Sequence, residues 1–317
     1  MSKLEDAGYE ARFRPMFDSS WRTLDDKFRV CTSIRDNGVE REPVSLRSLE
    51  GSRHLEALFF RRNPLSLEEL GILPNLSSLA IVPQTRTTIA RIPLHFPNLK
   101  NLVLPMDENV IKDVQRLPVS MPGIEGVAFL ESGETVKLTG MRGLRSCFPN
   151  ATAITIKGAD LQNCSLEPLA GVHLDTLDLS KTKAALKTKT PLRVDNLFLE
   201  DNSYTSDNIA PLKDAKILSL KLGGNYLDDT SIPTLLSVVG LRSISLYHNS
   251  ISLEGISKLA EHPTLEEINV EFYKYEGLEK ELSKVGIKVR EVIMPKRQTE
   301  GRGEAESALL KLLDALE

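Results

Sequence analysis

The sequence predicts an α/β solenoid that stacks one short strand per repeat, and three observations lead to this prediction. Segments that begin at Val194, Ile217 and Leu241 each carry an aliphatic residue at positions 1, 4 and 6 and an asparagine at position 9. Weaker copies of the pattern recur along the chain at intervals of 20 to 27 residues. In several copies a proline stands two residues before position 1, where it ends the preceding element. A strand with this spacing can bury its apolar face only against neighbouring copies, so the repeats must stack.

Eleven repeats share one register along the chain. Ten steps over 234 residues give a mean repeat of 23.4 residues, and so many copies in phase are not a chance pattern. The position-1 residues are Leu55, Leu76, Leu99, Ile124, Ala151, Leu174, Val194, Ile217, Leu241, Leu265 and Val289. Asparagine occupies position 9 in four repeats, at Asn63, Asn202, Asn225 and Asn249. We expect these four side chains to form a ladder that satisfies backbone groups, and the middle repeats, which lack it, to be irregular.

The pattern L-x-x-L-x-L-x-x-N resembles that of leucine-rich-repeat proteins over residues 55–294, roughly three quarters of the chain. The resemblance implies a curved, horseshoe-like solenoid with a parallel β-sheet on the concave face. It also implies short helices and extended segments on the convex face. Residues 65–73, 232–239 and 253–260 have helical spacing, whereas residues 182–193 do not, so we expect a mixed convex face.

The sequence divides into three parts. Residues 1–43 do not repeat, and their apolar spacing predicts a helical cap on the first repeat, with a separate recognition element as the alternative. Residues 44–294 are predicted to form the solenoid, and residues 275–284 are predicted to form a cap helix. Residues 295–317 comprise a polar linker and an amphipathic helix that folds back on the solenoid or pairs with a partner or a second copy. The apolar face of that helix consists of Leu309, Leu312, Leu313 and Leu316.

Composition narrows the range of partners. The net charge of -4 gives no support for nucleic acid or an anionic membrane as partner, because both attract basic surfaces. The chain shows no signal segment and no apolar run long enough to span a membrane, so we expect a cytoplasmic protein, with a nuclear location left open. Cys31, Cys147 and Cys164 are widely spaced and suit a reducing compartment.

No pattern for catalysis, metal binding or cofactor binding is visible. The five histidines are isolated in the sequence, and there is no phosphate-binding loop or nucleophile motif. Gly223 and Gly224 fall just after a strand and are interpreted as turn geometry. We therefore expect no catalytic residue, no metal and no cofactor. The lysines at 181, 183, 187 and 189 are interpreted as a solvated convex loop, with contact to an anion or acidic partner as the alternative.

The concave face is the predicted binding surface, because strand alternation turns positions 3, 5 and 7 toward it. An apolar strip in the first repeats would mark an interface unless the N-terminal segment or a bent middle segment covers it. Later repeats contribute polar and aromatic side chains. The candidate partner-binding residues are Phe59, Arg61, Val82, Val103, Leu130, Asp178, Phe198, Glu200, Tyr247 and Glu271.

The predicted function is that of a non-catalytic module for protein–protein interaction that binds a protein partner on its concave surface. This step from fold to function is an analogy with other repeat proteins. The alternative is a structural or assembly subunit that oligomerises through the C-terminal helix, and an enzyme is a remote third hypothesis.

Overall fold

The computed structural model describes ten stretches of the chain, and these belong to two compact units. The described residues are 9–13, 31–36, 52–53, 55–59, 71–81, 86–116, 120–131, 136–138, 142–271 and 278–291. Unit 1 comprises Met1–Ser132 and Ser146–Ala151, and unit 2 comprises Gly133–Arg145 and Thr152–Glu317. In both units, successive strands pair side by side in chain order, which is the arrangement of a leucine-rich-repeat solenoid.

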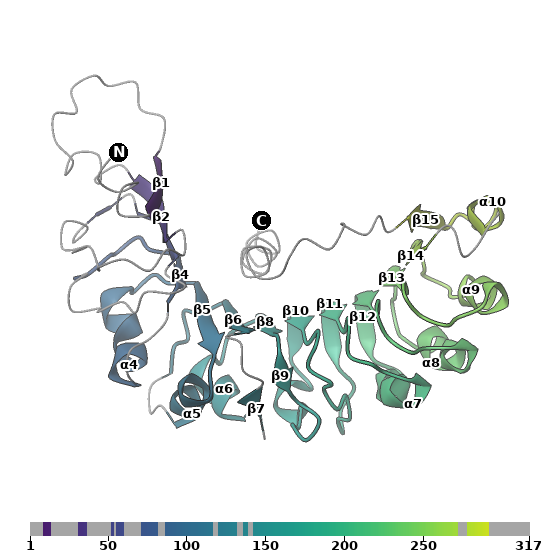
Figure 1. Ribbon diagram of the computed structural model, residues 1–317, viewed down its shortest axis with the longest axis horizontal. Coiled ribbons are helices and arrows are strands. Elements are labelled where there is room, and N and C mark those ends of the chain that lie inside the picture. The colour runs from purple at the N-terminus through teal and green to yellow at the C-terminus, as the bar shows by residue number, and fades with distance from the viewer. Residues whose placement is uncertain are drawn as a thin grey trace. The chain divides into compact units, whose positions relative to one another are not determined.

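Unit 1 contains a six-stranded run in the order β1 to β6 among its described residues. The strands β2 to β6 pair in parallel, and β1 pairs antiparallel with β2. The strands are β1 (Tyr9–Phe13), β2 (Cys31–Asp36), β3 (Ala57–Phe59), β4 (Ser78–Ala80), β5 (Asn101–Met106) and β6 (Gly126–Glu131). Helices α4 (Arg86–His95) and α5 (Glu108–Arg116) connect strands of this sheet, as Figure 1 shows.

The structure corrects the helical prediction where the N-terminal segment is described. Phe13, which the apolar spacing assigned to a helix, ends strand β1, and Ile34 of β2 pairs with Leu58 of β3. The first predicted repeat therefore has a further strand on its open edge. A strand edge carries unpaired backbone groups, and a neighbouring strand satisfies them in a way that apolar spacing alone does not reveal. The rest of the predicted cap helix, residues 14–30, lies outside the described residues.

Unit 2 carries a parallel run of strands on one side and short helices on the other. The strands are β8 (Ala153–Ile156), β10 (His173–Asp178), β11 (Arg193–Phe198), β12 (Lys216–Lys221), β13 (Ser243–Ser245), β14 (Glu267–Val270) and β15 (Lys288–Glu291). Strands β7 (Val136–Lys137) and β9 (Ala159–Asp160) form a separate pair. Within unit 2, Figure 1 shows β10 to β15 on the inner, concave side and the helices on the outer side.

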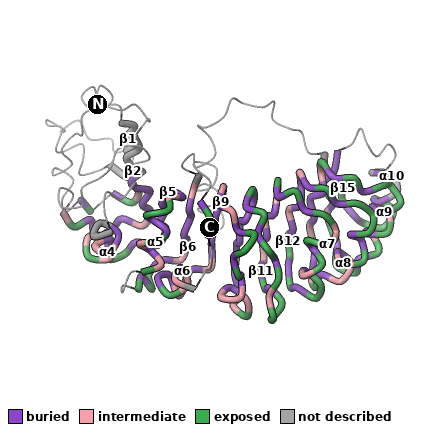
Figure 2. Tube along the Cα trace, turned by 60° about the horizontal axis from the view of Figure 1, so that its bottom comes forward, coloured by how far each residue is buried: buried purple, intermediate pink, exposed green. Residues whose placement is uncertain are grey.

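The helices of unit 2 are short. They are η2 (Glu167–Leu169), α7 (Ser206–Ile209), η3 (Ala210–Leu212), η4 (Asp229–Ser231), α8 (Ile232–Leu236), α9 (Leu253–Leu259) and α10 (Leu278–Ser283). The residues of α6 (Arg142–Cys147) are divided between the two units. Helices α8 and α9 confirm the helical spacing of residues 232–239 and 253–260, and residues 182–193 contain no helix, as expected. Figure 2 shows exposed residues gathered along this outer side.

The register of the strands agrees with the predicted repeats over most of unit 2. The position-4 residues pair directly across neighbouring strands and are fully buried: Ile154, Leu177, Leu197, Leu220, Ile244 and Ile268. In the next strand, however, Ile268 pairs with Val289, so Val289 occupies position 4 and the predicted start at Val289 is wrong. The correct frame begins at Gly286, and a glycine at position 1 cannot be recognised from an aliphatic pattern.

The prolines mark the same corner in successive repeats. The residue before each proline is buried, and its carbonyl accepts a hydrogen bond from the backbone nitrogen of the position-1 residue of the next repeat, at 3.2–3.3 Å. These buried corner residues are Leu73, Phe96, Met121, Phe148 and His262. In unit 1 the asparagine after the proline adds a second bond, because Asn75, Asn98 and Asn150 each donate to a carbonyl of the preceding corner at 2.6–3.0 Å.

Two aspartates link the outer turns of neighbouring repeats in unit 2. Asp228 Oδ1 accepts hydrogen bonds from Ser206 Oγ at 2.9 Å and from the backbone of Thr230 at 3.0 Å. Asp229 Oδ1 accepts from the backbone nitrogen of Ser252 at 2.8 Å. Hydrogen bonds from Thr230 and Ser206 hold the pKa of Asp228 below its ordinary value, and the bond from Ser252 lowers the pKa of Asp229.

These two carboxylates should make the protein less stable in acid. A folded-state pKa below the unfolded value adds stability above the unfolded pKa, and that stability is lost as the pH falls through the folded pKa. We expect the urea midpoint to fall between pH 6 and pH 3, and to fall less in an Asp228→Asn, Asp229→Asn double variant. The control is Asp207→Asn, an exposed aspartate in the first turn of α7. Equal losses in the wild type and the double variant would contradict the assignment.

Candidate recognition surface on unit 2

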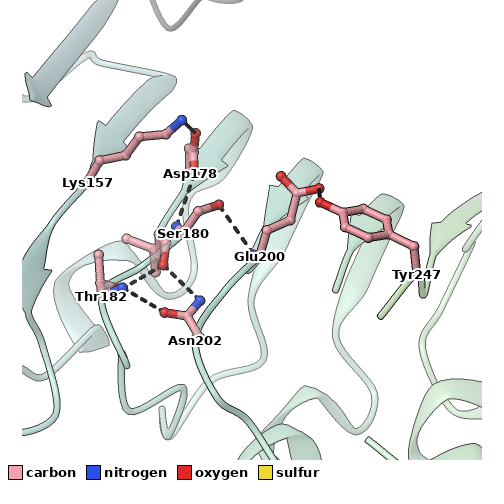
Figure 3. A network of polar contacts seen from close by, with 8 residues as sticks. Lys157, Asp178, Ser180, Thr182, Glu200, Asn202 and Tyr247 are labelled. Carbon is pink, nitrogen blue, oxygen red and sulfur yellow. Dashed lines mark hydrogen bonds and ion pairs between the residues drawn. The ribbon is translucent and has the colours of Figure 1, made fainter. Parts of the chain in front are cut away.

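Position 7 of three successive repeats builds an aromatic and acidic surface on unit 2. Glu200, Gly223 and Tyr247 follow the ends of β11, β12 and β13. The hydroxyl of Tyr247 donates to Glu200 Oε1 at 2.9 Å across the intervening repeat, as Figure 3 shows. A Cβ atom on Gly223 would lie 2.2 Å from Cε1 and Cζ of Tyr247. The tyrosine ring therefore lies across the glycine, and any side chain at Gly223 would displace it.

The surroundings of Tyr247 keep its hydroxyl group protonated, so that it can donate a hydrogen bond to Glu200. Burial, followed by the negative charge of Glu200 and their hydrogen bond, raises the pKa of Tyr247 above its ordinary value. The ring of His248 packs edge-on against Tyr247, with ring centroids 5.6 Å apart. Both Tyr247 and Glu200 are half-buried, so each keeps part of its surface open to solvent. The pair is thus fixed in place and still accessible.

A second set of polar contacts links the repeats of the neighbouring strands β8, β10 and β11. Lys157 Nζ lies 3.4 Å from Asp178 Oδ2, and the other oxygen of Asp178 accepts from the backbone of Ser180 at 3.0 Å. The backbone nitrogen of Glu200 donates to Ser180 Oγ at 3.3 Å (Figure 3). Asp178 is only 4% exposed, so its carboxylate acts within the protein and leaves little surface for a partner.

Buried asparagines at position 9 fix the turn that carries these side chains. Asn202 Oδ1 accepts from the backbone nitrogen of Thr182 at 2.7 Å (Figure 3). It also accepts from the backbone nitrogen of Lys183 at 2.7 Å, and the amide nitrogen of Asn202 donates to the carbonyl of Leu179 at 3.0 Å. Asn225 and Asn249 make equivalent bonds one and two repeats further on. The residues at position 8 of four successive repeats have backbone angles in the left-handed region: Lys181, Asp201, Gly224 and His248. Because this conformation recurs, position 7 emerges in the same direction from each repeat.

Glu271 is the position-7 residue of the next repeat, but its carboxylate already contacts His248. Its Oε1 accepts from the backbone nitrogen of His248 at 2.8 Å and lies 2.7 Å from His248 Nδ1. Glu271 is 5% exposed. As with Asp178, the contacts of Glu271 orient neighbouring groups, and Phe198, which is half-buried in β11, offers more surface to a partner.

The apolar strip predicted in the first repeats is only partly described. Val103 is 7% exposed, and the residues that pair with it on the neighbouring strands, Ala80 and Ala128, are 6% and 0% exposed. The prediction of an exposed anchor is therefore wrong at Val103, because its side chain is almost fully covered. Leu130 is half-buried. The side chain of Phe59 and the residues Arg61, Asn63 and Val82 lie outside the described part of the chain.

The assembly hypothesis also lies outside the described residues, since these end at residue 291. Leu309, Leu312, Leu313 and Leu316 therefore keep the status of a sequence-based prediction. Light scattering of the full chain beside a chain that ends near Pro295 tests that hypothesis.

Sequence reasoning identified Tyr247 and Glu200 separately but missed the contact between them. The signal was present in the sequence, because a glycine at position 7 lies between repeats with an acidic and an aromatic residue at the same position. Tyr247 and Glu200 are 47 positions apart in the sequence, and only the stacking of three repeats brings them into contact.

The described histidines each contact a different group. His95 lies against the carbonyl of Gly71, His262 against the carbonyl of Val238, and His248 against Glu271. His173 lies 2.8 Å from Asp195. Among the described residues, no helix is long and apolar enough to cross a bilayer.

Cys147 and Cys164, the two cysteines whose side chains are described, should resist thiol reagents in the folded protein. Burial raises the pKa of Cys147 to about 12 and that of Cys164 to about 11, and the thiolate is the reactive form. We expect at most one of the three thiols to react rapidly with a chromogenic disulfide reagent at pH 7.5, and all three to react in guanidinium. Rapid reaction of two or more thiols in the folded protein would be inconsistent with this burial.

Comparisons with known proteins give no family assignment. A scan against protein-family models and a search of curated proteins both find no match. Among solved structures 39 chains match, and one is the crystal structure of a TLR13–ssRNA13 complex. That chain is 18% identical in sequence with a TM-score of 0.43, and the match covers 83% of this chain and 49% of that chain. The chain thus spans about half the length of that solved structure.

Proposed function

We propose that the protein is a non-catalytic recognition module that binds a protein partner on the sheet face of unit 2. The observation that carries this proposal is the Tyr247 ring, which lies across Gly223 and is tied to Glu200 at 2.9 Å. A side chain already fixed in one conformation loses little entropy on binding. Aromatic residues held in this way are typical of the few positions that dominate the energy of protein interfaces.

The burial of the candidate residues assigns them different tasks. Phe198, Glu200 and Tyr247 are half-buried and supply contact surface. Asp178 and Glu271 are nearly buried, at 4% and 5% exposure, and position their neighbours. A partner would meet an aromatic centre with a carboxylate beside it, surrounded by the polar side chains of positions 3 and 5. This mixture of an aromatic core and a polar rim matches the general composition of protein interfaces.

The test is affinity capture with matched variants, followed by titration of the purified partner. Tyr247→Ala removes the ring, and Gly223→Ala keeps the tyrosine but forces it from its place. The control is Tyr226→Ala, which removes an equally large tyrosine that is 68% exposed on unit 2 and lies outside the position-7 row. We expect Tyr247→Ala to weaken binding by about 2 kcal/mol, or roughly 30-fold, and Tyr226→Ala to leave binding unchanged.

Two outcomes decide the proposal. Loss of the same partner with Tyr247→Ala and Gly223→Ala, but not with Tyr226→Ala, supports recognition at this surface. Binding of that partner with unchanged affinity to Tyr247→Ala would show that the surface is not the recognition site.

A further inference from the structure

One imidazole and two carboxylates meet where strands β10 and β11 begin. His173 and Asp175 belong to β10, and Asp195 belongs to β11. His173 Nε2 lies 2.8 Å from Asp195 Oδ1, and one ligand atom from each of the three residues lies within 4.8 Å of the other two. Tyr247, in contrast, follows the end of its strand, so this cluster is separate in the fold from the proposed recognition surface.

The register of the two strands forces like charges together. Leu174 pairs with Val194 and Thr176 with Asn196, so Asp175 and Asp195 lie side by side on neighbouring strands. Like charges in that arrangement repel. The imidazole of His173 supplies at most one positive charge against two carboxylates. Asp175 forms no salt bridge with any other residue in the described part of the chain. A divalent cation would neutralise both carboxylates.

We infer that His173, Asp175 and Asp195 form a binding site for one divalent transition-metal ion of the Zn²⁺ type. An imidazole ligand favours Zn²⁺, Co²⁺ or Ni²⁺ over Mg²⁺ and Ca²⁺, which prefer oxygen alone. Ligand atoms around tetrahedral zinc lie about 3.4 Å apart for metal–ligand bonds of about 2.1 Å. The spacings between 2.8 and 4.8 Å bracket that distance, and the exposed side chain of His173 and the half-buried side chain of Asp195 can adjust to it.

The site would be open and would join two repeats. Three protein ligands leave a fourth position for water, as in open zinc sites. The ligands come from adjacent strands, so the bound ion links the repeat of β10 to that of β11. Because such an ion binds the folded form in preference, it raises the stability of unit 2. The sequence alone suggested no metal site at His173, because Asp195 lies 22 positions further along the chain and the two residues match no short metal-binding motif.

Titration of the full chain with ZnCl₂ by calorimetry in metal-free buffer tests the inference, with Co²⁺ absorption as a report on coordination. We expect one saturable equivalent in the wild type and a loss of at least tenfold in affinity with His173→Ala, Asp175→Asn or Asp195→Asn. The control is His248→Ala, since His248 pairs with a single carboxylate, Glu271, and should bind Zn²⁺ like the wild type. Mg²⁺ should give no comparable binding.

Thermal unfolding separates a metal site from a simple charge cluster. Without metal, Asp175→Asn should leave the melting temperature unchanged or raise it, because repulsion is relieved. With Zn²⁺, the melting temperature should rise in the wild type and not in Asp175→Asn. Absence of saturable Zn²⁺ binding, equal weakening by His248→Ala, or equal affinity for Mg²⁺ would overturn the inference. None of these results depends on the protein partner, so the proposed function is tested separately.

Discussion

Replacing Asn225 by alanine should lower the free energy of unfolding by about 3–5 kcal/mol, because it leaves several buried backbone groups without partners. Asn225 Oδ1 accepts from the backbone nitrogens of Asn202 and Tyr204 at 3.1 and 2.9 Å. Its amide nitrogen donates to the carbonyls of Leu199 and Leu222 at 3.0 and 2.8 Å. Asn225 is 3% exposed, so water cannot replace these bonds. Urea unfolding followed by far-UV circular dichroism measures the loss.

The matched control is Asn163→Ala, which removes the same amide from an exposed position. Surface substitutions of this kind change stability by about 0.5 kcal/mol or less. If Asn225→Ala were no more destabilising than Asn163→Ala, the asparagine ladder would have no role in holding the turns.

Replacing Leu220 by alanine is the second large effect we expect, at about 2–5 kcal/mol. Leu220 is fully buried at position 4 of β12, and its register partners Leu197 and Ile244 are also fully buried. The truncation leaves a cavity that close-packed neighbours cannot fill. The same urea unfolding experiment gives the loss.

The same strand provides the control, because Leu218 lies two residues away and is 41% exposed. Leu218→Ala should cost clearly less than Leu220→Ala. Equal losses for the two variants would contradict the register assigned to β12.

The fold was predictable because each repeat satisfies the same local requirement. Leu177, Leu197 and Leu220 are recognisable as position 4 from their own segments, and stacking then places them opposite one another. The prediction failed where a strand joins the sheet without the aliphatic pattern of the repeat. Position 1 of the last described repeat is Gly286, which is not aliphatic. The strands at residues 9–13 and 31–36 extend the sheet beyond the first predicted repeat, and no local pattern predicts them.

The candidate site was less predictable, since it depends on relations between repeats. Alternation correctly turned Glu200 and Tyr247 toward the same face of the sheet. It could not reveal that Val103 and Asp178 are almost fully covered, because burial depends on neighbouring strands and on their partners. Nor could it show that His173 meets Asp195, since that contact follows from the pairing of two strands.

The contact between Tyr247 and Glu200 also restricts how the solenoid could change in length. Its three participants occupy three consecutive repeats, with Gly223 in the middle one. Removing or duplicating one repeat between Val194 and Asn249 would leave every remaining repeat able to fold. It would nevertheless separate the tyrosine from its carboxylate or place a different residue beneath the ring. The number of repeats in this segment is therefore a determinant of the surface, in addition to the identity of its side chains.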